Sequence, residues 1–151
     1  MLRLEHRVPP PLVLAACALL MWLVAFPAFD FALPGREMIA AAFFTVALII
    51  GLPAVLGFHR AKTTVNPLKP ETSTALVTGG IYRWTRNPMY LAMLLLLVAW
   101  ACLVSNWAAL AILPLFVAYL NRFQIGPEER ALQARFGAEF ESYRRKVRRW
   151  L

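Results

Sequence analysis

The chain has few of the residues that build metal centres and disulfide frameworks. It contains two cysteines and two histidines among 151 residues. Cys17 and Cys102 both lie inside apolar stretches, and His6 and His59 are far apart, so neither pair has the spacing of a metal site or a redox motif. We therefore expect a protein without a metal, in which both cysteines are small buried hydrophobic residues.

Acidic residues are also scarce. Asp and Glu total 8 against 16 Lys and Arg, which gives a formal net charge of +8. Such an excess can indicate nucleic-acid binding, but here the basic residues flank apolar runs and form no separate domain. The pattern instead favours contact with anionic membrane lipid, and we expect no nucleic-acid partner.

Long polar stretches are the third scarce feature, because apolar residues make up 60% of the chain. Soluble domains are roughly 45–50% apolar. Four apolar runs cover about residues 11–29, 38–58, 89–105 and 107–123. Because a membrane-spanning helix needs about 20 such residues, we predict an all-α integral membrane protein with about four transmembrane helices. The last two runs meet at the polar pair Ser105-Asn106, which predicts a tight helical hairpin.

The basic residues alternate between the connecting segments as four spans require. Lys and Arg number 2 before the first run, 5 between the second and third, and 8 from Arg122 at the end of the fourth run onwards, whereas the other two loops hold 1 and 0. Four spans place both termini and the loop 59–88 on the side that holds most of this charge. The positive-inside rule predicts that this side is cytoplasmic.

The region after the fourth run has the pattern of an amphipathic helix. Pro127 suits a first helical turn, and Gly137 is a candidate break. Apolar residues recur in steps of three and four, which indicates a helix on the membrane surface or under the bundle. They are Leu132, Phe136, Phe140, Tyr143, Val147 and Trp150. The chain is then one domain with two transmembrane helices (1–58), a cytoplasmic loop (59–88), a helical hairpin (89–123) and a cytoplasmic C-terminal helix (124–151).

The segment 79–90 is the first candidate for chemistry. Pro88 pre-sets the first turn of the third helix, where free backbone N–H groups favour an anion. Asn87 offers hydrogen bonds, and Tyr82 and Tyr90 offer flat surfaces for a purine. A capped helix with interfacial aromatic anchors is the competing interpretation, and composition alone favours it.

A second polar patch follows the fourth run. Glu128 and Glu129 sit where two acids stabilise a helix start through its dipole. Arg122 lies at the end of an apolar run, where it can extend to the membrane surface or hold a carboxylate through a bidentate pair. The residues alone leave these alternatives open.

Taken together, the two patches resemble one family. The order is Leu76-Val77-Thr78-Gly79-Gly80-Ile81-Tyr82, then Arg86-Asn87-Pro88-Met89-Tyr90, a helical hairpin, Arg122, and a Glu-Glu-x-x-Leu-x-x-x-Phe-Gly block. This half of the chain resembles the superfamily of isoprenylcysteine carboxyl methyltransferases and phospholipid methyltransferases, which are integral membrane enzymes. The resemblance implies S-adenosylmethionine as cofactor, a lipophilic small-molecule acceptor that enters from the membrane, and a bacterial inner-membrane location with a cytoplasmic cofactor site in the loop 59–88 and the C-terminal region.

The resemblance also implies roles for individual residues. Leu76, Val77 and Tyr82 would line the adenosine side of the cofactor. Its methionine end would meet the segment 87–90, which consists of Asn87, Pro88, Met89 and Tyr90. Glu128 or Glu129 would meet its ammonium group or ribose, and Arg122 would orient the acceptor. Arg122 and Tyr90 are the expected catalytic residues.

One position departs from the family pattern. The usual Arg-His-Pro reads Arg86-Asn87-Pro88 here. Asn keeps its hydrogen bonds but does not titrate near neutral pH. This departure argues against an acceptor identical to that of the eukaryotic enzymes. A carboxylate acceptor needs no base, and near these motifs only Tyr90 and the Glu pair are candidates for one. The sequence therefore favours a carboxylate, as in an isoprenylcysteine-like molecule.

Two other functions fit the same sequence. A membrane reductase of the sterol-reductase type would use NADPH, although no extra basic cluster for a 2′-phosphate is visible. A non-enzymatic membrane subunit would use the basic C-terminal region to dock a partner.

Overall fold

The computed structural model describes residues 8–60 and 76–151, and within these ranges the regular structure is helical. Residues 1–7 and 61–75 lie outside the described parts, and with them two basic residues of the N-terminus and much of the predicted loop 59–88. The elements are α1 (Pro10–Leu23), η1 (Pro27–Phe29), α2 (Arg36–Arg60), η3 (Gly80–Arg83), α3 (Pro88–Val104), α4 (Trp107–Leu110), α5 (Ile112–Leu120), η4 (Asn121–Ile125), α6 (Gly126–Phe136) and α7 (Ala138–Lys146).

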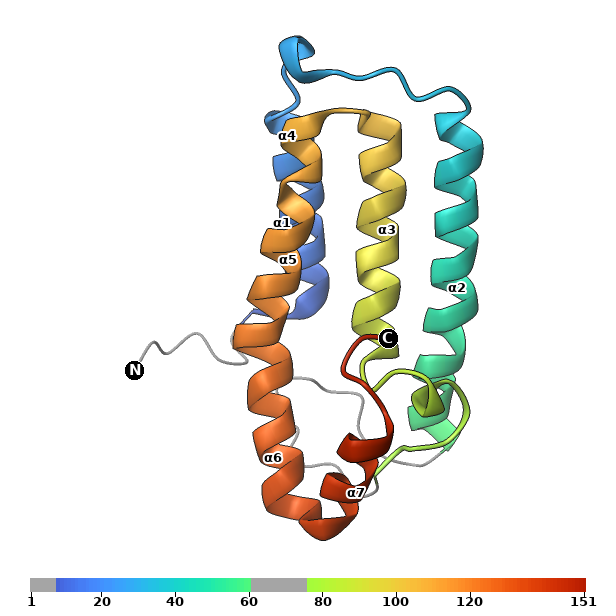
Figure 1. Ribbon diagram of the computed structural model, residues 1–151, viewed down its shortest axis with the longest axis vertical. Coiled ribbons are helices and arrows are strands. Elements are labelled where there is room, and N and C mark those ends of the chain that lie inside the picture. The colour runs from blue at the N-terminus through green and yellow to red at the C-terminus, as the bar shows by residue number, and fades with distance from the viewer. Residues whose placement is uncertain (1–7, 61–75) are drawn as a thin grey trace.

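The long helices stand side by side as a bundle (Figure 1). The connections from α1 to α2 and from α3 to α4 lie at one end of the bundle. At the other end α6 extends beyond the bundle, and α7 and the C-terminus turn back towards the start of α3. The two candidate patches therefore meet at a single end of the molecule.

Small residues let α2 and α3 approach closely. Ala40, Ala47 and Ala54 are buried and recur at intervals of seven, so they form one stripe along α2. A Cβ added to Gly51 would lie 3.1 Å from the Cβ of Ala92 on α3. Small-residue seams of this kind are how helices pack where lipid removes the hydrophobic drive for association.

The outward side of α2 is apolar. Met38, Ile49 and Leu52 expose 77%, 64% and 59% of their surfaces, and such a surface suits lipid rather than water. Two helical segments are long and apolar enough to cross a membrane, Arg36–Gly57 and Trp107–Phe136, while the apolar helices α1 and α3 are shorter. The protein is therefore an all-helical membrane protein.

Asn106 ties the connections at the end of the bundle remote from α6. Its side chain is fully buried and donates to Phe26 O and to Asp30 Oδ1, both at 2.8 Å. The amide oxygen accepts from the backbone N–H groups of Ala108 and Ala109 and so caps α4. With Ser105 at a left-handed φ of 49°, this is the tight turn of the predicted hairpin.

The fourth helix does not end near Phe123, as the apolar run suggested, but continues through η4 into α6. The five residues of η4 form a π-helix, in which the N–H of Gly126 bonds to Asn121 O. Pro127 explains this turn, because it has no N–H to donate to Phe123 O and its ring would clash there in a regular helix. A Cβ at Gly126 would lie 3.0 Å from Asn121 O, so the turn favours glycine.

The C-terminal helix is broken at Gly137, which has a φ of 49°. This confirms Gly137 as the break, but the single apolar stripe through Val147 to Trp150 is wrong. Helix α7 ends at Lys146, and Val147 is extended with φ −123° and ψ 132°. The last residues leave the helix because other groups of the protein satisfy their backbone carbonyls.

Candidate functional site

The candidate site begins at the start of α3. Asn87 has φ −127° and ψ 54°, and Pro88 occupies the first helical turn, as the sequence predicted. The Thr85 hydroxyl accepts a hydrogen bond from the Asn87 N–H at 3.1 Å. Pro88 and Tyr90 are both buried, so this helix start is packed against the rest of the bundle.

Tyr90 and Glu128 connect the two sequence patches. The Tyr90 hydroxyl donates to Glu128 Oε1, which joins the first turn of α3 to the first turn of α6. Among the described residues, Tyr90 is the one hydrogen-bond donor to the Glu128 carboxylate. A carboxylate can accept several more hydrogen bonds. Glu128 therefore keeps acceptor capacity for a cation.

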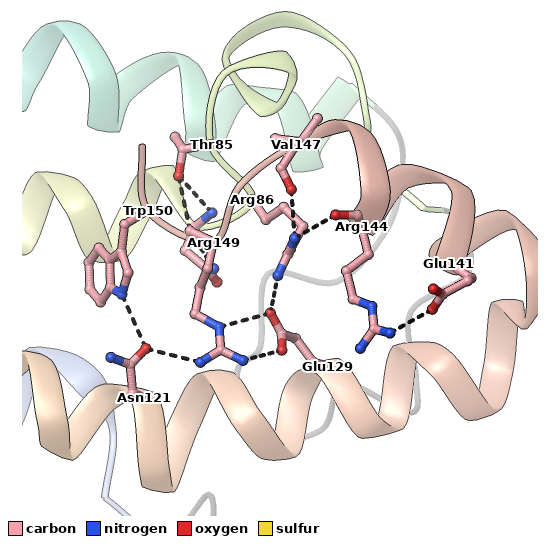
Figure 2. A network of polar contacts seen from close by, with 10 residues as sticks. Thr85, Arg86, Asn121, Glu129, Glu141, Arg144, Val147, Arg149 and Trp150 are labelled. Carbon is pink, nitrogen blue, oxygen red and sulfur yellow. Dashed lines mark hydrogen bonds and ion pairs between the residues drawn. The ribbon is translucent and has the colours of Figure 1, made fainter.

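Glu129 is adjacent in sequence but has different partners. Arg86 Nη2 lies 2.7 Å from Oε1, and Arg149 contacts both carboxylate oxygens through Nε at 3.1 Å and Nη2 at 2.5 Å. Figure 2 shows the Glu129 carboxylate between these two guanidinium groups. The Arg86 and Glu129 side chains are only 10% and 14% exposed, so this cluster is shielded from water.

Arg86 also holds the end of α7. Its Nη1 donates to Arg144 O at 3.0 Å and to Val147 O at 2.6 Å (Figure 2). Arg144 O belongs to the last turn of α7 and Val147 O follows directly after the helix, so neither carbonyl has a partner within the helix. Arg86 thereby caps α7, while its Nε is buried and has no hydrogen-bond partner among the described residues.

The residues after α7 pair with the segment before α3. Arg86 N donates to Arg148 O at 3.0 Å, and Asn87 Nδ2 donates to Arg149 O at 2.9 Å. The Trp150 indole donates to Asn121 Oδ1 at 3.1 Å, which extends the contacts to η4 (Figure 2). Three segments that are distant in sequence are thus joined at one place.

Tyr82 is buried against α2 rather than presenting an open ring. Its hydroxyl lies 3.4 Å from Ala54 O, and both Tyr82 and Val77 approach Gly57. Burial raises the pKa of Tyr82, and the neighbouring Tyr143 and Glu128 add to the effect. The hydroxyl of Tyr143 donates to Tyr82 O at 2.7 Å, and burial raises the pKa of Tyr143 to about 12.

The remaining predicted residues are placed less centrally. Leu76 and Met89 are half-buried. Arg122 lies on η4 with an exposed side chain, and its guanidinium carbon is 5.5 Å from the Phe123 ring centroid. The two expected catalytic residues thus differ in setting, since Tyr90 is buried and Arg122 faces outwards.

Two residues of the cluster were missed as site residues. In the sequence, Arg86 stands out only as part of a motif, and Arg149 is one of several basic residues in the C-terminal region. Their signal is a pair of acids in a chain of excess positive charge, since a shielded carboxylate requires a cationic partner. The sequence offers many arginines near the C-terminus and does not say which one reaches Glu129.

Comparison with known proteins identifies the family of the chain. The family model described as phospholipid methyltransferase matches residues 35–139, which include α2, α3 and α6. An uncharacterized protein of Haemophilus influenzae is 44% identical over 63 residues, which are 42% of this chain and 100% of that protein. No solved structure matches the chain. The chain belongs to the phospholipid methyltransferase family, whose members are membrane enzymes that use S-adenosylmethionine to methylate lipid-type acceptors.

Proposed function

We propose that this methyltransferase acts on a small lipophilic acceptor at the end of the bundle where α3, α6 and the C-terminus meet. The observation that carries the proposal is the Tyr90–Glu128 hydrogen bond, which joins the two sequence blocks of the family resemblance. Family membership sets aside the reductase and the non-enzymatic subunit, since the family consists of methyltransferases.

Four spans with a cytoplasmic site form part of this proposal. α1 and α3 have 14 and 17 residues, which suffice for about 21 and 26 Å at 1.5 Å per residue. They cross a hydrocarbon layer of about 30 Å only with help from flanking residues or local thinning. The positive-inside rule supports the cytoplasm for the end that carries Arg83, Arg86 and the basic residues of α7.

The donor set fits S-adenosylmethionine. Among the described residues Glu128 accepts a hydrogen bond from Tyr90, and its carboxylate retains acceptor capacity for the cofactor's ammonium group. Apolar Leu76 and Val77, with Tyr82, suit the adenosine, and the segment 87–90 suits the methionine end. The residues proposed to line the cofactor site are Leu76, Val77, Tyr82, Asn87, Pro88, Met89, Tyr90 and Glu128. Of the two candidate acids, Glu129 is paired with Arg86 and Arg149 and supports the site from beside Glu128. When bound, S-adenosylmethionine supplies an electrophilic methyl group on a sulfonium.

The chain's own contribution is positioning. Holding two reactants in line at about 3 Å supplies much of the acceleration of such a displacement. Tyr90, fixed by Glu128, orients the site, and exposed Arg122 offers a guanidinium fork to an acceptor carboxylate at the lipid boundary. A carboxylate acceptor loses no proton on methylation, which matches an Asn at position 87.

A methylation assay on purified protein tests the acceptor. Prenylcysteine analogues and aminophospholipids are offered with labelled S-adenosylmethionine, and Arg122→Gln is compared with the parent. We expect turnover of the carboxylate and a raised KM in the variant, because Gln lacks the cationic fork. Turnover of the amines alone would overturn the proposed acceptor.

A further inference from the structure

The five residues 147–151 after α7, here called the C-terminal strap, have a role that the family resemblance does not define. The strap lies against the start of α3 through backbone carbonyls. Arg148 O accepts from Arg86 N at 3.0 Å, and Arg149 O accepts from Asn87 Nδ2 at 2.9 Å and from the Thr85 hydroxyl at 3.2 Å. The polar side chain of Asn87 is therefore engaged by the strap.

The side chain of Arg149 extends from the same strap to α6. Its guanidinium meets both oxygens of Glu129, and Nη1 lies 3.5 Å from Asn121 Oδ1 on η4 (Figure 2). One residue thus holds the α3 side through its carbonyl and the α6 side through its guanidinium. Arg86 reaches Glu129 directly from the segment before α3, and Arg149 adds a second connection between that segment and α6.

We propose that Arg149 is a positioning residue for the cofactor site, an inference that rests on the proposed function. Glu129 is the immediate neighbour of Glu128, so fixing Glu129 fixes the turn of α6 that presents Glu128. Asn87 lies just before the turn of α3 that presents Tyr90. Arg149 therefore sets the distance between the two halves of the Tyr90–Glu128 pair without contacting either residue.

The chemistry at Glu129 requires an arginine. A planar guanidinium donates to two carboxylate oxygens at once and fixes their orientation, whereas an ammonium group is a point charge. Arg86 occupies Oε1 from the other side, so the carboxylate has two cationic partners and is held from both sides. Such a carboxylate is committed to the strap, and Glu128 remains for the cofactor's ammonium group.

The opposite arrangement is that Arg149 competes with the cofactor for Glu129 and must be displaced. The two ideas predict changes of opposite sign. Loss of the guanidinium weakens cofactor binding if Arg149 positions the site, and strengthens binding if Arg149 blocks it. The backbone contacts of the strap favour positioning, since they anchor Arg149 beside Asn87 while its guanidinium holds Glu129.

The test compares Arg149→Gln, Arg149→Lys and the control Arg145→Gln in the detergent-purified full chain. Arg145 has a side chain 77% exposed that pairs with Glu141 on the surface, so it matches in charge but not in position. Calorimetry measures S-adenosylhomocysteine binding, and hydrogen exchange measures protection of the Arg86 amide. We expect about a tenfold loss of affinity in Arg149→Gln, the size of a typical coupling between neighbouring residues, with faster exchange at Arg86. Arg149→Lys should recover part of the affinity and part of the protection at Arg86, and Arg145→Gln should match the parent in both.

A double variant tests the route of the effect. If Arg149 acts through Glu129, adding Arg149→Gln to Glu129→Gln causes little further loss of affinity. Parent-like or tighter binding by Arg149→Gln overturns the positioning role while leaving the proposed function intact. A parent that binds no S-adenosylhomocysteine although its Arg86 amide is protected overturns the proposed site and the role of Arg149 with it.

Discussion

Replacing Glu129 with Gln is the sharpest test of the ion cluster, because the change keeps the side-chain shape and removes the charge. It leaves two guanidinium groups facing each other across a neutral amide. The unpaired charge of Arg86 costs more free energy than that of Arg149, since the Arg86 side chain is only 10% exposed. Removing one partner of a shielded ion pair costs about 3–5 kcal/mol. Arg149 is 39% exposed, so its pair adds no more than about 1 kcal/mol.

The expected loss is therefore about 3–6 kcal/mol of unfolding free energy. At about 2–4 °C per kcal/mol for a chain of this size, the melting temperature should fall by roughly 6–24 °C. Thermal unfolding in detergent, followed by circular dichroism, measures this shift. Glu141→Gln is the matched control, because Glu141 also pairs with two arginines, Arg144 and Arg145, but on the surface of α7. These two pairs lower the pKa of Glu141. Equal melting temperatures for Glu129→Gln and Glu141→Gln would refute the shielded cluster.

Three further changes probe the rest of the fold. Asn106→Ala removes the cap of α4 and two buried donors, and should lower stability by about 2–3 kcal/mol in a denaturant titration; a loss below 1 kcal/mol would contradict the role of this turn. Gly51→Leu should overpack the seam between α2 and α3 and cost about 1–3 kcal/mol of unfolding free energy. In Gly57→Ala the added Cβ lies at ordinary contact distances, so this change should be tolerated. A lower melting temperature for Gly57→Ala than for Gly51→Leu would disprove the seam. Tyr143→Phe should cost about 1 kcal/mol, and because its pKa is about 12 the loss should not vary between pH 6 and 9; a loss that changes over that range would show another group at work.

Much of the fold followed from local signals in the sequence. The apolar runs marked the long helices because lipid demands length and continuity. Pro88 marked the start of α3, and Gly137 marked the break after α6, because each fixes backbone geometry by itself. These features depend on nearest neighbours along the chain and are therefore readable without tertiary information.

Other features depended on partners that a one-dimensional pattern does not reveal. The stripe continued to Trp150, yet the strap leaves the helix because Arg86, Thr85 and Asn87 bind its carbonyls from 61 or more residues away. The π-helix before Pro127 was missed because proline, which lacks an N–H donor, usually indicates a helix end. Here the helix continues with a small change in winding instead. The predicted site residues Asn87 and Glu129 contact Arg149, which only the folded chain identifies.

The measurement that tests the central claim most directly is a calorimetric titration of the purified protein with S-adenosylhomocysteine. Glu128→Gln and Tyr90→Phe are compared with Arg145→Gln, and a monodisperse, helical sample is the condition for each. The account predicts micromolar binding by the parent and by Arg145→Gln, and loss of binding in the two variants of the Tyr90–Glu128 pair. Equal binding by all four proteins would contradict the proposed site.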